Sequence, residues 1–191
     1  MNFIIMKSNI FISFLKLLKI KHTYSFSNQF FNEHPHKYNF FGLSSMLSDY
    51  GIENIGLKIS NKKDLINIEC PFIAHVGINF VIIEKISDNK ISFVLNGDRT
   101  SILLDDFYKM WTGYVLLAEA NESSIEPNYL IHRKEAIFAK TQKILPVIFS
   151  IFLLFYFIIS SKSYLNIGII LLFLINIVGV IIGYLLIPIV R

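Results

Sequence analysis

The sequence predicts an α+β domain, with helices packed on an antiparallel sheet, followed by a two-helix transmembrane hairpin. Three observations lead to this prediction. Helical periodicity dominates residues 1–54, short β-rich runs separated by turn residues fill residues 55–118, and two long uncharged segments follow residue 143. We therefore expect a soluble domain over residues 1–120. A basic juxtamembrane helix or linker over 121–143 and membrane helices over 144–161 and 164–190 complete the predicted organisation.

The N-terminal residues predict two helices. The apolar face of the first, within residues 1–21, is formed by Ile10, Phe14, Leu17 and Leu18. Lysines interrupt this run, which argues against a signal peptide. The helix either packs as the first helix of the domain or lies on a membrane surface. Residues 23–33 predict the second helix, with Phe26 and Phe30 facing inward.

A third helix follows residue 38, and the domain is organised around it. Its apolar residues at helical spacing are Phe40, Leu43, Met46 and Leu47. Gly51 supplies the left-handed residue that ends a helix. A helix N-terminus fed by a tight loop is where several enzyme classes place a nucleophile or bind an anion.

After residue 54 the spacing of apolar residues changes from that of helices to that of strands. Runs predicted as strands are residues 55–59, 71–76, 79–83, 91–95, 101–104 and 114–118, the last of which closes the sheet. Turns are predicted at Gly77, 88–90 and 96–98, and a capped helical turn at 61–66. Asp105 and Asp106 are predicted to cap a short helix, and Trp111 is predicted to pack a turn with Gly113.

The last two segments predict membrane helices. Segment 164–190 exceeds the roughly 20 residues that a span needs, and segment 144–161 is near the lower limit of about 17. Pro146 is predicted in the first turn of its helix, where proline is tolerated. Basic residues precede the first span and only Lys162 separates the two. The positive-inside rule therefore places the domain and the C-terminus in the cytoplasm.

Composition excludes several classes of function. The net charge of +4 is modest and the lysines are dispersed except before the apolar segments, which predicts a membrane partner and no nucleic-acid partner. The single cysteine, Cys70, excludes an internal disulfide, a CxxC redox pair and a cysteine-based metal site. We expect no cofactor and no metal, because His34 and His36 have no third ligand at a suitable spacing.

The soluble part resembles cysteine peptidase family 39, whose papain-like domains remove double-glycine leaders from bacteriocin precursors at their export transporters. The resemblance rests on the order and spacing of residues 42–51, 71–76, 80–83 and 106–117. A more similar branch lacks the catalytic cysteine segment and is fused to a vitamin K epoxide reductase membrane domain and thioredoxin. The segments that fit this branch are His34-Pro35, 118–120, Tyr129 and 176–179. The resemblance implies a papain-like fold at the bacterial inner membrane.

The resemblance also implies where catalytic residues would lie. The nucleophilic cysteine corresponds to Tyr38, the base histidine to Asn79, the orienting aspartate to Asn96 and the oxyanion-hole glutamine to Asn32. A papain-like mechanism needs a thiolate and an imidazole. A phenol, with an ordinary pKa of about 10, and an amide supply neither. We expect a non-proteolytic domain whose groove, beside these residues and His75, binds an extended peptide or protein.

Two alternative functions remain open. An active leader peptidase would need Cys70 and His75 to form an unexpected dyad, whereas otherwise Cys70 is an incidental thiol and His75 a hydrogen-bonded structural residue. Alternatively, the chain is a non-catalytic part of a split reductase–thioredoxin system that forms disulfides. Neither apolar segment contains a cysteine, so a separately encoded redox membrane protein would have to supply the chemistry. A separately encoded transporter is the partner that the peptide-export functions would imply.

Overall fold

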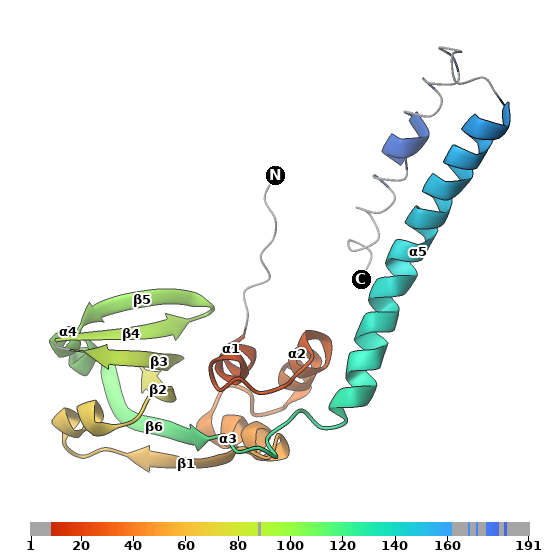
Figure 1. Cartoon of the computed structure of the whole chain (residues 1–191). Coiled ribbons are helices and arrows are strands. Elements are labelled where there is room, and N and C mark those ends of the chain that lie inside the picture. The colour runs from red at the N-terminus through yellow and green to blue at the C-terminus, as the bar shows by residue number, and fades with distance from the viewer. Residues whose placement is uncertain are drawn as a thin grey trace. The chain divides into compact units, whose positions relative to one another are not determined.

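The computed structural model describes residues 9–87 and 89–161, together with residues 168, 171, 175–179 and 182. A six-stranded antiparallel sheet of order β1-β6-β2-β3-β4-β5 lies in the first of two compact units, which ends at His132 (Figure 1). The predicted order of helices before an antiparallel sheet is confirmed. The elements are α1 (Ile10–Leu17), α2 (Tyr24–Glu33), α3 (Phe40–Asp49), β1 (Glu53–Lys58), η1 (Lys62–Asn67), β2 (Phe72–Val76), β3 (Asn79–Ser87), β4 (Lys90–Leu95), β5 (Asp98–Leu103), α4 (Leu104–Met110), β6 (Trp111–Glu119) and α5 (Tyr129–Ser161).

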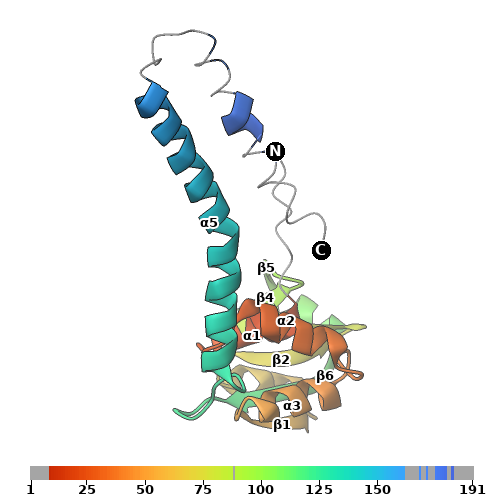
Figure 2. The ribbon, with the colours of Figure 1, turned by 90° about the vertical axis from the view of Figure 1, so that its right-hand side faces the viewer.

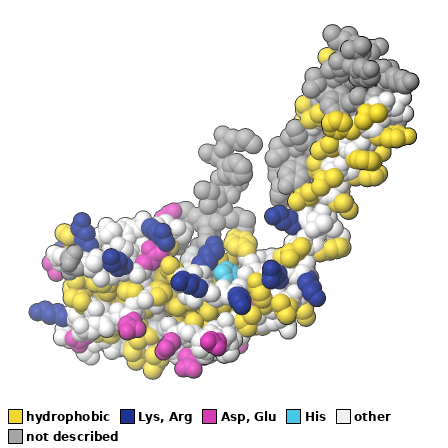
Figure 3. All heavy atoms as spheres, viewed as in Figure 1, with side chains coloured by type: hydrophobic (Ala, Val, Ile, Leu, Met, Phe, Trp, Pro, Cys, Tyr) yellow, Lys and Arg dark blue, Asp and Glu magenta, His cyan; other side chains and the backbone are white. Residues whose placement is uncertain are grey.

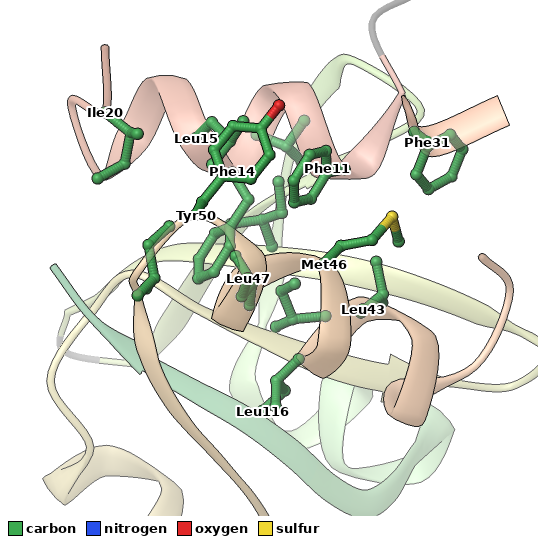
Figure 4. Packing of buried hydrophobic residues seen from close by; sticks show 14 residues of the cluster. Phe11, Phe14, Leu15, Ile20, Phe31, Leu43, Met46, Leu47, Tyr50 and Leu116 are labelled. Carbon is green, nitrogen blue, oxygen red and sulfur yellow. The ribbon is translucent and has the colours of Figure 1, made fainter. Parts of the chain in front are cut away.

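The N-terminal helices pack on one face of the sheet, and α3 lies against β1 and β6 (Figure 2). This packing buries a first hydrophobic cluster, which contributes roughly 1.5–3 kcal/mol for each large apolar side chain that it buries. Its members include Phe11, Phe14, Leu15, Leu43, Met46, Leu47, Ile73, Ile82 and Leu116 (Figure 4). The predicted α3 is confirmed, and Gly51 follows it with a φ of +67°.

The apolar face of α1 differs from the predicted one. The helix begins after Asn9, whose side chain accepts a hydrogen bond from Ile12 N–H at 2.9 Å. Phe11, Phe14 and Leu15 are fully buried in the first cluster. The other predicted members of the face are only half-buried, namely Ile10, Leu17 and Leu18.

The opposite face of the sheet carries a second hydrophobic cluster. Because side chains alternate along a strand, Phe72 and Ala74 of β2 enter this cluster whereas Ile73 enters the first. Leu65 of η1 and Phe107 of α4 are fully buried in it. Burial on both faces explains why the sequence of β2 is an almost continuous apolar run.

Two local predictions about residues 105–111 are wrong. Trp111 does not pack a turn but begins β6, where it is 3% exposed and its indole N–H donates to the Tyr114 carbonyl oxygen at 3.1 Å. Asp105 and Asp106 do not cap α4, because the N-cap residue is Leu103; their carboxylates lie in the first turn, next to the positive end of the helix dipole. Strand β6, which includes the predicted last strand, pairs with both β1 and β2.

A buried carboxylate joins the end of the first unit to α2. Glu126 is 1% exposed. Its Oε2 accepts hydrogen bonds from Thr23 N–H at 2.6 Å and from the Ser27 hydroxyl at 3.0 Å. Its Oε1 accepts from the Thr23 hydroxyl at 2.8 Å and from His132 Nδ1 at 3.0 Å. The His132 ring also stacks on Phe26, with 3.8 Å between the ring centroids. We call Thr23, Ser27, Glu126 and His132 the Glu126 cluster.

Helix α5 is continuous from Tyr129 to Ser161 and therefore includes residues predicted both as linker and as the first span. Pro146 consequently lies inside the helix and not in a first turn. Among the residues that the structure describes, one helical stretch, Tyr129–Leu153, is long and apolar enough to cross a membrane. Many apolar side chains on α5 are exposed (Figure 3). Most of the second predicted span, 164–190, lies outside the described residues.

Candidate functional site

The loop of residues 34–39 delivers the chain into α3. The Asn39 side chain caps the helix, because its Oδ1 accepts a hydrogen bond from Gly42 N–H at 2.8 Å. Gly42 allows the loop to pack closely on the helix, since a Cβ at this position would lie 1.9 Å from the His36 carbonyl oxygen. Tyr38, the residue before the cap, therefore stands directly before the N-terminus of α3.

The Tyr38 side chain is 76% exposed. Its ring packs edge-on against Phe31, with 6.2 Å between centroids, and the Lys37 ammonium lies 5.4 Å from the ring centroid. The same ammonium donates to the Asn32 carbonyl oxygen at 2.6 Å. Lys37 thus links the predicted nucleophile and oxyanion positions, but it binds Asn32 through the backbone and not through the amide side chain.

The hairpin of β2 and β3 meets the first turn of α3. Asn79 begins β3 opposite Val76 and is exposed. The next residue, Phe80, packs its ring against Phe40 of α3 with 4.8 Å between centroids. Because Phe40 and Phe80 each lie within two residues of a predicted site position, this contact brings the Tyr38 and Asn79 segments to the same end of the sheet.

Asn96 reaches this end of the sheet from the turn between β4 and β5. The turn needs left-handed backbone, with φ of +52° at Asn96 and +87° at Gly97. In the β3–β4 register Ile82 lies opposite Val94, so the chain that continues from Val94 to Asn96 runs toward the start of β3. The spacing of the three predicted positions in the sequence is thus compatible with one shared site.

His75 lies beside this site and is held by hydrogen bonds. Its ring is 6.2 Å from the Phe40 ring and 5.0 Å from the Phe80 ring. The Thr112 hydroxyl donates to the His75 carbonyl oxygen at 3.0 Å, and its oxygen lies 2.9 Å from His75 Nδ1. Since that hydroxyl hydrogen is already donated, Nδ1–H is the donor of the second bond. The expectation of a hydrogen-bonded His75 is confirmed.

Cys70 lies far from the α3 N-terminus. It precedes β2, whereas His75 lies near the opposite end of that strand. Its sulfur is close to the Ile86 backbone, near the end of β3, while Asn79 begins β3. The stretch of β3 from Asn79 to Ile86 is about 23 Å long, at roughly 3.3 Å per residue. Partial desolvation of the sulfur raises the pKa of Cys70, and the Ile86 backbone hydrogen bond only partly offsets this effect.

We expect Cys70 to react slowly with alkylating reagents. Because its pKa is raised, a smaller fraction of the thiol is ionised near neutral pH, and the thiolate is the reacting form. Iodoacetamide labelling at pH 7.5, followed by mass spectrometry, should be several-fold slower in the folded chain than in the same chain unfolded in urea. Faster labelling in the folded chain would indicate an activated thiolate and contradict this assignment.

The surface around the α3 N-terminus is rich in exposed apolar side chains. Tyr38 is 76% exposed, Phe41 72% and Ile78, at the tip of the β2–β3 hairpin, 92%. The sequence singled out Tyr38 but not Phe41 or Ile78. The only sequence signal for these two residues is that each is apolar at a position where the helix or the turn exposes its side chain. Such side chains suit contact with apolar groups of a ligand, and the loop histidines and Lys37 add hydrogen-bond donors.

Elsewhere, the described residues form hollows but no cluster of metal ligands. Within residues 9–87 and 89–161, no set of three or more His, Cys, Asp or Glu side chains is placed to hold a metal ion. One groove of about 640 Å³ lies between the start of β1, the end of β6 and the segment before β2. A second hollow of about 590 Å³ lies between residues 18–21 and 120–125.

Comparison with known proteins identifies both a family and a fold. The model of a family described as the peptidase C39 family matches residues 15–123. No curated protein matches the sequence.

Two solved structures share the fold at low sequence identity. A double-glycine motif protease from an AMS/PCAT transporter, solved in complex with the leader peptide, has a TM-score of 0.52 and 17% identity over 58% of this chain and 81% of that chain. The peptidase domain of Streptococcus ComA, a bifunctional ABC transporter involved in a quorum-sensing pathway, has a TM-score of 0.50 and 15% identity, covering 58% of this chain and 88% of that chain. The fold of the first unit is therefore the papain-like one that the resemblance implies.

Proposed function

Because the chain belongs to the peptidase C39 family, we propose that its domain binds an extended peptide at the α3 N-terminus without cleaving it. The observation that carries this proposal is the chemistry of the three positions at that end of the sheet. Tyr38 precedes the helix, Asn79 begins β3 and Asn96 occupies the β4–β5 turn. The resemblance assigns the family's catalytic positions to these three residues, and a phenol and two amides cannot act as the thiolate, imidazole and carboxylate that cleavage needs.

The surface favours binding of a peptide. The exposed rings of Tyr38 and Phe41 and the Ile78 side chain offer apolar contacts. Ile78 directly precedes Asn79, whose amide can both donate hydrogen bonds to a peptide backbone and accept them from it. A peptide ligand also agrees with the similar protease that was solved with a leader peptide.

We place this domain on the cytoplasmic side of a membrane. Helix α5 carries the apolar residues of the first predicted span, and Arg133, Lys134 and Lys140 precede them. Basic residues next to a span favour the cytoplasmic side. The second predicted span, 164–190, would complete a hairpin and return the C-terminus to the cytoplasm.

A second candidate function, cleavage of leader peptides, is favoured by membership of a peptidase family. It would require Cys70 to act as the nucleophile, because this is the only cysteine in the chain. The position of Cys70 near Ile86 and its raised pKa count against such a role. Both candidates predict peptide binding, and they differ in whether the bound peptide is cut.

The full-length chain in detergent micelles can be tested with a fluorescent double-glycine leader peptide as the probe. We expect measurable binding by anisotropy, about tenfold weaker after Tyr38→Ala or Ile78→Asp, because either change removes an exposed apolar contact of the site. Tyr24→Ala is the matched control, since Tyr24 is also exposed but lies on α2.

Mass spectrometry of the same samples tests for cleavage. Intact peptide after prolonged incubation is the expected result. A cleaved peptide, with cleavage abolished in Cys70→Ser, would establish the second candidate instead. Binding that is unaffected by both Tyr38→Ala and Ile78→Asp would refute the proposed site.

A further inference from the structure

Strand β1 is an edge of the sheet, at the bottom of the view in Figure 1. Among the described strands it pairs with β6 alone. An edge strand presents backbone N–H and C=O groups on its free side and can accept another strand. Five of the six residues of β1 are exposed.

The free backbone groups of β1 can be assigned from the ladder. Ile59 N–H donates to the Gly113 carbonyl oxygen at 2.8 Å, in continuation of the β1–β6 register. Residues of an antiparallel pair alternate between those that hydrogen-bond to the partner strand and those that do not. Counting back from Ile59, the N–H and C=O groups of Asn54, Gly56 and Lys58 therefore point away from β6.

One face of β1 is open at the middle of the strand. Gly56, in the middle of the strand, has no side chain, and a Cβ built there would have no other atom within 4 Å. Its neighbours on the strand, Ile55 and Leu57, are apolar but 56% and 41% exposed. Edge strands are commonly protected by proline, bulges or several charges, and β1 carries only a charge at each end.

The groove of about 640 Å³ runs beside this strand and is acidic. The carboxylates of Glu53, Glu69 and Glu119 line it. Glu53 lies directly opposite Glu119 in the β1–β6 register, an arrangement of like charges that disfavours the bare sheet. Because side chains alternate, Ile55 and Leu57 lie on the same side of β1 as Glu53.

From these observations we infer that β1 binds an extended peptide as an additional strand of the sheet. The hydrogen bonds go to the outward backbone groups of Asn54, Gly56 and Lys58. The ligand places a lysine or arginine next to the Glu53–Glu119 pair, and apolar side chains on alternate residues next to Ile55 and Leu57. This site is separate from the one proposed at the α3 N-terminus, so either site can be tested without the other.

The experiment uses the full-length chain in detergent micelles and a set of fluorescent hexapeptides. Each peptide carries one basic residue and apolar residues at alternate positions, with threonine between them, in both chain directions. We expect binding by anisotropy. N-methylation of every other peptide nitrogen should weaken it at least tenfold, because it removes the donors that a strand needs. Replacing the basic residue with glutamate should have a similar effect.

Protein variants locate the site. Glu53→Lys is expected to weaken binding several-fold, and Glu53→Lys combined with Glu119→Lys at least tenfold. Glu122→Lys, the same charge change as the single variant but on an exposed loop, should not change binding. Gly56→Pro removes an outward N–H and should also weaken binding. The inference is overturned if no peptide binds, if N-methylated peptides bind equally well, or if only Tyr38→Ala abolishes binding.

Discussion

Replacing Glu126 with alanine is expected to lower the free energy of unfolding by about 2–5 kcal/mol, because several buried donors lose their acceptor at roughly 1–3 kcal/mol each. The carboxylate is almost fully buried and accepts hydrogen bonds from Thr23, Ser27 and His132. Its loss leaves the Thr23 backbone N–H without a partner, at about 1–3 kcal/mol. It also removes a negative charge from the N-terminus of α2.

The change can be measured by urea titration of the full-length chain in detergent. Trp111 is the only tryptophan and is 3% exposed, so its fluorescence reports the unfolding of the domain. Glu126→Gln should cost less than alanine, because one carbonyl oxygen remains as an acceptor. Glu122→Ala is the control and should change stability by less than about 0.5 kcal/mol. An unchanged midpoint for Glu126→Ala would show that the Glu126 cluster does not stabilise the fold.

The second large effect is expected for Gly42→Ala, which should destabilise the domain by about 3 kcal/mol or more. Alanine is normally favoured over glycine inside a helix by about 1 kcal/mol. Here the new Cβ would lie 1.9 Å from the His36 carbonyl oxygen and 2.4 Å from its carbon. Both are backbone atoms, so no side-chain rotation relieves the clash, and the loop must move away from α3.

Gly56→Ala is a matched control for this prediction, because the space around Gly56 is open. It should leave the unfolding midpoint unchanged or slightly raised. Because the displaced loop carries Tyr38, Gly42→Ala should also weaken binding of the leader-peptide probe. A stable Gly42→Ala variant with unaltered peptide binding would contradict the close packing of the loop on α3.

The sequence predicted the elements whose signals are local. The α3 helix has its apolar spacing, its asparagine cap and Gly51, and the β4–β5 turn has the Asn96-Gly97 pair that left-handed backbone requires. The position of Trp111 depended on tertiary structure, since a tryptophan near a glycine fits a turn or a strand equally well. The buried face of α1 could not be fixed from the sequence either, because it is set by packing against side chains of α2, α3 and the sheet.

For the site, the resemblance assigned the catalytic positions to Tyr38, Asn79 and Asn96. The structure places each at an element boundary, namely before α3, at the start of β3 and in the β4–β5 turn. The aromatic contacts of Phe40 with Phe80 and His75 were not foreseen, since they join segments that are distant in the sequence. The Glu126 cluster had no sequence signal either. A single glutamate in a polar stretch has no periodicity, and its burial arises from donors about 100 residues earlier.

The same cluster bears on how the chain is made. The hydrogen bond between Thr23 and Glu126 spans 103 residues, so it cannot form until nearly the whole domain has been synthesised. His132 completes the cluster from the first turn of α5. The residues that complete the Glu126 cluster are therefore synthesised together with the first turn of α5. A nascent chain that stops at residue 120 lacks Glu126 and His132, which contact α2 and the residue before it.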